Sequence, residues 1–135
     1  MINVENEVFS TVATAIRSDF TGIFVSGEAV AAPSSFPAVT LVEDDNSTYQ
    51  RSLDSSGQEN HAQVMYSCNV YSNKSAGKKA ECKAILAVID AEMFGMGFLR
   101  VGSSPMEVPN ANGAIYRMVA RYKATISKDK AIYRR

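Results

Sequence analysis

Residues 116–126 read Tyr-Arg-Met-Val-Ala-Arg-Tyr-Lys-Ala-Thr-Ile and alternate regularly between two kinds of side chain. One phase is apolar or small, with Tyr116, Met118, Ala120, Tyr122, Ala124 and Ile126; the other carries Arg117, Val119, Arg121, Lys123 and Thr125. Successive side chains of a strand point to opposite faces, so this stretch predicts a strand with one buried face. Residues 62–71 alternate in the same way and predict a second half-buried strand.

The segments around these two strands predict two helices and three further strands. Apolar residues at steps of three and four predict a helix over about 4–18, with Asn3 as its cap, and a second helix that follows the turn at 72–75 and ends at Gly95 and Gly97. Short apolar runs predict strands at 22–27, 36–42 and 98–108, the last before a turn at 109–113. This order predicts an α+β fold with two helices on one face of a mostly antiparallel, four- to five-stranded sheet.

Two polar segments interrupt or follow this pattern. Residues 43–59 have no convincing apolar period, and such long connections are usually functional or mobile. They predict either a long loop or a protruding hairpin whose only apolar contacts are Tyr49 and Leu53. Residues 128–135 predict a polar tail too short to pack alone, so we expect a single domain over 1–127.

Composition excludes several classes of protein. The chain has 135 residues, 46% hydrophobic and 21% charged, which is ordinary for a globular domain. No apolar run is long enough to span a membrane, and the first residues lack the pattern of a signal peptide, so we expect a protein made in the cytosol. Cys68 and Cys82 both fall on apolar phases, which favours buried hydrophobic residues over a disulfide or a reactive thiol.

The charges are divided unequally along the chain although the net charge is zero. Residues 1–59 hold nine carboxylates and two cations, whereas residues 60–135 hold twelve cations and five carboxylates. If one domain carries an acidic and a basic flank, copies can meet acid to base in a heterologous contact, the kind that closes rings. Alternatively, the two halves interleave in space and form an ordinary mixed surface.

Residues that could carry chemistry are few. The single histidine, His61, lies at a predicted strand start with no nucleophile or metal signature, which favours a solvated residue. The run Glu43-Asp44-Asp45-Asn46 could ligate calcium but lacks the EF-hand spacing, so a solvated loop or a contact between subunits is favoured. Gly95 and Gly97 lie at a helix end rather than in a phosphate loop. We therefore predict no enzyme, no cofactor and no metal site.

The basic face of residues 117–123 is the remaining candidate surface. Arg117, Arg121 and Lys123 share one face of the predicted strand, whereas Tyr116 and Tyr122 lie on the other and cannot stack beside them. A protein contact is therefore favoured over a nucleic-acid site. We predict subunit contacts between Glu43, Asp44 and Asp45 of one copy and Arg117, Arg121 and Lys123 of a neighbour.

The chain resembles the tail-terminator and tail-completion proteins of tailed bacteriophages over roughly residues 4–126. The resemblance is carried by Phe-Pro-Ala-Val-Thr-Leu-Val-Glu-Asp at 36–44, Ala-Gln-Val-Met-Tyr-Ser-Cys-Asn-Val-Tyr-Ser-Asn at 62–73, a lysine-bearing helix, Gly-Phe-Leu-Arg at 97–100, and Ile-Tyr-Arg-Met-Val-Ala-Arg-Tyr at 115–122. These proteins share a pattern of elements and few invariant residues, and they have no catalytic residues to carry over.

This resemblance implies a structural virion protein. Such proteins form a ring, usually hexameric, that caps the head-proximal end of the tail tube and joins it to a neck or connector protein, while DNA passes through without specific recognition. It also implies a sheet with two helices and a long loop or hairpin, and a location in the tail or neck of the virion. Another neck component, such as a head-completion or stopper protein, stays open as an alternative. A small nucleic-acid-binding module is the alternative from a different class, and an enzyme is a third.

Overall fold

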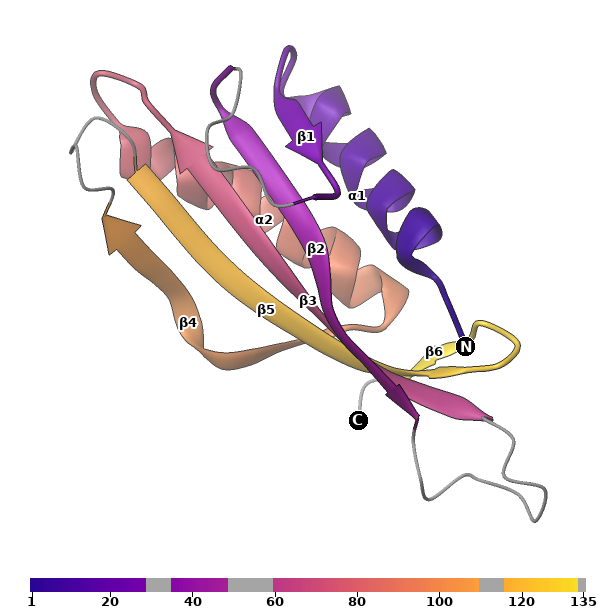
Figure 1. The fold of residues 1–135 in the computed structure, drawn as a ribbon. Coiled ribbons are helices and arrows are strands. Elements are labelled where there is room, and N and C mark those ends of the chain that lie inside the picture. Colours follow the sequence, from indigo (N-terminus) through magenta and orange to yellow (C-terminus); the bar gives the residue numbers. More distant parts are fainter. Residues whose placement is uncertain (29–34, 49–59, 110–115, 134–135) are drawn as a thin grey trace.

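The fold is an α+β sandwich of one sheet and two helices, as the sequence predicts (Figure 1). The computed structural model describes residues 1–28, 35–48, 60–109 and 116–133, at 102–109 and 133 by their backbone. The elements follow in the order α1 (Glu5–Asp19), β1 (Phe24–Ser26), β2 (Ala38–Thr48), β3 (His61–Ser72), α2 (Lys78–Met96), β4 (Leu99–Pro109), β5 (Tyr116–Ser127) and β6 (Ile132–Tyr133). The sheet order is β1-β2-β3-β5-β4, with β6 paired to β5 off this path. Only β1 and β2 are parallel among these pairs.

Strands β3 and β5 form the centre of the sheet and confirm the predicted alternation. They pair in an unbroken antiparallel register from His61 opposite Ser127 to Ser72 opposite Tyr116. Every even-numbered residue of both strands is buried except Tyr116, which is partly buried. The face they form lies against the two helices, so the apolar phase read from the sequence is the covered face of the sheet.

The two helices contribute one apolar stripe each to this core. Their buried residues are Val8, Val12, Ala13 and Ile16 in α1, and Cys82, Ile85, Leu86, Ile89 and Met93 in α2. The N-cap residue of α1 is Val4 and not the predicted Asn3, although Oδ1 of Asn3 accepts the backbone N–H of Glu5 at 3.0 Å. Gly97, with φ of 112°, ends α2. Among the described residues, neither helix combines the length and the apolar character needed to cross a membrane.

Strand β2 is longer than the sequence predicts. The expected strand ended at residue 42, but β2 continues through the acidic run to Thr48, opposite Ala62 of β3. Residues 43–48 are therefore strand and not loop, and the hairpin alternative fits this part of the polar segment. Its remainder, 49–59, including Tyr49 and Leu53, lies outside the described residues, as do residues 110–113 of the expected turn.

The segment expected to be a free tail folds back onto the domain. Thr125 and Ile126 of β5 pair with Tyr133 and Ile132 of β6, and the side chain of Ile132 packs against the core. The Nζ atom of Lys130 lies 2.8 Å from Oε1 of Glu7 in α1. Residues 128–133 therefore belong to the same folded unit as the rest of the chain.

Candidate functional site: the open face of the sheet

The sheet has one face that no helix covers, and the predicted interface residues lie mostly there (Figure 1). In this view α2 lies behind β2 and β3, and α1 lies beside and behind β1, so the viewer looks onto the open face. Odd-numbered residues of β3 and β5 point to it, because their even-numbered neighbours point to the helices. We define the open face by the outward side chains of β2, β3 and β5.

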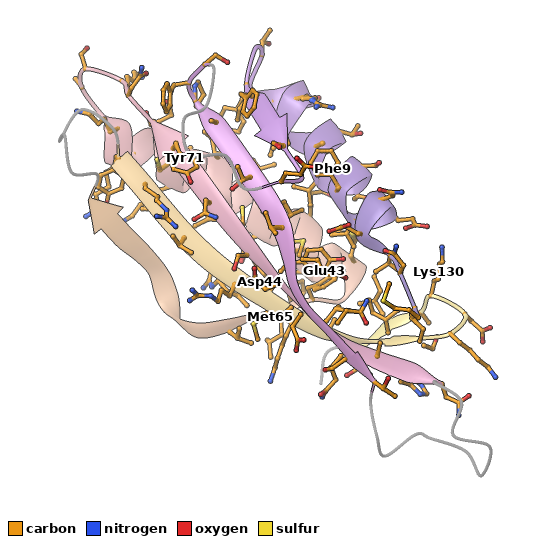
Figure 2. The ribbon with its side chains drawn as sticks, viewed as in Figure 1. Phe9, Glu43, Asp44, Met65, Tyr71 and Lys130 are labelled. Carbon is orange, nitrogen blue, oxygen red and sulfur yellow. The ribbon has the colours of Figure 1, made fainter. Side chains whose placement is uncertain are left out.

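A β-bulge in β2 decides which acidic side chains reach this face. The register passes from Glu43 opposite Tyr66 directly to Asp45 opposite Met65, so Asp44 is the additional residue. In a regular strand, Asp44 and Asp45 would point to opposite faces. Here the Oγ–H of Ser67 donates to Oδ2 of Asp44 on the open face, and Asp45 lies across from the outward-pointing Met65. The bulge therefore places two successive carboxylates on the same face. Figure 2 labels the first of them, Asp44, together with Met65.

Glu43 is separated from these two carboxylates. It points to the covered side, where the hydroxyl of buried Tyr66 donates to its Oε1 at 3.1 Å. Burial raises the pKa of Glu43 above its ordinary value, and the nearby charge of Glu5 in α1 adds to this; the Tyr66 hydrogen bond acts in the opposite direction. Glu43 therefore lies on the other side of β2 from Asp44 and Asp45, and the subunit contact expected of these three residues stays a prediction.

The three predicted basic residues share the open face of β5. Arg117 has two side-chain partners on this face. Its Nε donates to Oδ1 of Asn69 at 3.0 Å, and its guanidinium lies 6.0 Å from the ring centre of Tyr71. Arg121 is exposed and Lys123 is partly exposed. Neither forms an ion pair or side-chain hydrogen bond in the part of the chain that the structure describes.

The acidic and basic side chains lie at the same level along the strands. Val42 and Arg121 both lie opposite Ser67, and Asp45 and Lys123 both lie opposite Met65. Because β3 runs between β2 and β5, the two rows are separated by about 10 Å, two strand spacings. We name Asp44 and Asp45 the acidic row, and Arg121 and Lys123 the basic row. They face the same solvent but do not neutralise each other directly.

Sequence reasoning missed the β3 residues between these rows. It placed Tyr116 and Tyr122 away from the cations, and Tyr122 is indeed buried, with its hydroxyl donating to Oδ1 of Asp90 at 3.0 Å. Tyr71, however, lies beside Arg117. Its position depends on the pairing of β3 with β5, and the polar phase of residues 63–71 was the only signal that could have indicated it.

The residues considered for chemistry are dispersed. Cys68 and Cys82 are buried free thiols as predicted, and burial raises the pKa of Cys68 to about 12 and that of Cys82 to about 11. His61 begins β3 and is partly buried. No group of three or more metal-ligating side chains occurs among the described residues. Glu43 and Asp44 point to opposite sides of the sheet, so they cannot bind one calcium ion together.

Comparison with known proteins does not assign this chain to a family. The chain matches no protein-family model, and no curated protein is significantly similar to it in sequence.

Proposed function

We propose that this chain is a structural virion protein that forms a ring, usually hexameric in proteins of this kind, at the head-proximal end of a phage tail tube. The observation that carries the proposal is the arrangement of unpaired opposite charges on the open face. The resemblance described above supplies the biological setting. The fold, with two helices on one side of a mostly antiparallel sheet, is the fold that this resemblance implies.

The position of the two rows within the sheet supports a ring. The acidic row lies on β2, one strand from the β1 edge, and the basic row lies on β5, one strand from the β4 edge. Two copies placed side by side in the same orientation therefore bring a basic flank towards an acidic flank. Such a contact is heterologous, and repeating it with a rotation closes a ring. Opposite charges would orient the copies as they approach each other.

In this proposal the ring binds the end of the tail tube on one side and a neck or connector protein on the other. DNA passes through the opening without sequence recognition. A head-completion or stopper protein of the same neck would use the same ring and the same charge arrangement. The order of assembly at the tube end would separate these two roles.

One observation favours a nucleic-acid-binding module as a second candidate. Arg117 and Tyr71 form a cation–π pair next to Arg121 and Lys123, so a stacking aromatic and three cations share one face. This candidate predicts DNA binding that weakens steeply with salt. It also predicts that Tyr71→Ala lowers DNA affinity while leaving the solution mass unchanged.

Light scattering at low and high salt tests the ring. A ring-sized mass that falls as salt rises is the expected result, since exposed charge contacts are screened. Arg121→Glu should reduce that mass, whereas Lys83→Glu, an equal charge change on the exposed side of α2, should leave it unchanged. A monomer at every concentration and salt would contradict spontaneous ring formation. Electron microscopy with tail tubes then tests whether the protein occupies one tube end.

A further inference from the structure

Three charged side chains of the open face form neither an ion pair nor a side-chain hydrogen bond within the described chain: Asp45, Arg121 and Lys123. Their spacing defines the surface that would complement them. It must present a basic row opposite β2 and an acidic row opposite β5, about 10 Å apart and at the same level along the strands. The open face of a second copy, turned over, has this pattern.

Two kinds of two-fold axis could bring two open faces together, and the charges distinguish them. An axis across the strands would place β2 over β2 and acid over acid. An axis along β3 places β2 of each copy over β5 of the other and keeps every residue at its own level. We propose that two copies of this chain pair through their open faces about a two-fold axis along β3. The acidic row of each copy then contacts the basic row of the other copy, so the interface contains two such contacts.

The centre of this contact is suited to close approach. Met65 lies between Asp45 and Lys123 in the register, so the axis brings Met65 towards Met65 of the second copy. Methionine adapts its shape to such a contact. The charged rows flank this methionine on both sides, and Gln63 and Ser67 are its polar neighbours on the same face of β3. Sheets that pack face to face keep their strands nearly aligned, which an axis along β3 satisfies.

The pair goes beyond the proposed function. A ring needs heterologous contacts between flanks, whereas the pair is isologous and closes at two copies. Both would use Arg121 and Lys123. The pair would therefore occupy the charges that assembly requires, and the ring would form only after the pair separates.

Chemical cross-linking tests the axis directly. On a two-fold axis along β3, residues of β3 face their own counterparts, so Ser67→Cys treated with a short bismaleimide should give a covalent dimer at high yield. Lys83→Cys on α2 is the matched control and should stay monomeric. The native thiols of Cys68 and Cys82 are buried, with pKa values raised to about 12 and about 11, so they should react slowly. Equal yields from the two variants would overturn the pair.

A charge-reversal mixture tests the pairing of the rows. Asp45→Lys and Lys123→Glu, which lie opposite each other across this axis, should each weaken self-association by roughly tenfold or more, because two-fold symmetry repeats every altered contact. Mixed together, the two variants should form a complex of two chains, since each reversed charge meets an opposite one. A mixture that builds larger species would overturn the pair and support the ring. A mixture and a wild-type protein that both stay monomeric would overturn both.

Discussion

The two faces of the sheet handle polar groups differently. Three buried polar side chains of the covered face donate hydrogen bonds to carboxylates at its rim: Tyr66 to Glu43, Tyr122 to Asp90 and Ser72 to Glu81. On the open face, Asp45, Arg121 and Lys123 have no such partner among the described residues. Burying a polar group without a hydrogen bond costs free energy, so the covered face must satisfy its groups internally. The solvent-exposed charges of the open face have no such requirement and are left for a second molecule, whereas its buried hydroxyls at Thr40 and Thr125 have no hydrogen-bond partner in the described chain.

The largest expected effect lies in the covered face. Ile89 of α2 is fully buried against the sheet, so Ile89→Ala should lower the free energy of unfolding by about 2–5 kcal/mol. Leu99→Ala is the matched control on the open side, where Leu99 is 43% exposed, and should cost under about 1 kcal/mol. Urea denaturation measures both. Equal costs would show that the open face is covered in the folded protein.

The second effect lies where α2 ends against the C-terminal strand. Gly97 has φ of 112°, and a Cβ atom there would lie 2.8 Å from the carbonyl oxygen of Ile132. Gly97→Ala should therefore lower the free energy of unfolding by about 2–3 kcal/mol. Gly95→Ala adds the same methyl group inside the helix, in open space, and should be neutral or slightly stabilising. Thermal unfolding would refute this if the two variants behaved alike.

The third effect is a pH dependence at the rim of the covered face. Burial raises the folded-state pKa of Glu43, so the folded protein binds the proton more tightly than the unfolded chain. The stabilisation from this carboxyl is complete below its unfolded pKa and is lost as pH rises through the folded pKa. Glu43→Gln removes that loss. Its melting temperature relative to wild type should therefore rise from pH 4 to pH 7.

Asp45→Asn removes a neighbouring charge that helps to raise the pKa of Glu43, so its profile should lie between those of wild type and Glu43→Gln. The acidic residue Glu7 tests the opposite sign, because the hydrogen bond from Lys130 lowers its pKa. Its stabilisation is present above the unfolded pKa and is lost as pH falls through the folded pKa. A Glu43→Gln profile parallel to that of wild type at every pH would contradict the assignment of Glu43 to the covered face.

The sequence predicted the covered face well and the open face poorly. Burial determines the alternation of residues 62–71 and 116–126 and the apolar stripes of both helices. Each buried position requires an apolar or small side chain, so the pattern can be seen in the sequence. The bulge at Asp44 and the β6 strand follow instead from pairing between distant segments. The same holds for Tyr71 beside Arg117: which residues face each other across β3 and β5 depends on register. Solvent-facing positions accept many residue types, so the sequence at these positions gives little information about the register.

The smallest expected effect on stability is at Arg121, and it separates folding from association. Arg121 is exposed and unpaired within the described chain, so Arg121→Glu should change the free energy of unfolding of the monomer by under about 0.5 kcal/mol. Arg117→Glu, four residues earlier on the same face, loses the bond to Asn69 and the contact with Tyr71 and should cost about 1 kcal/mol. Urea denaturation at high salt, where association is screened, measures both. If Arg121→Glu cost as much as Arg117→Glu, the basic row would stabilise the fold, and its role in binding a second copy would lose its support.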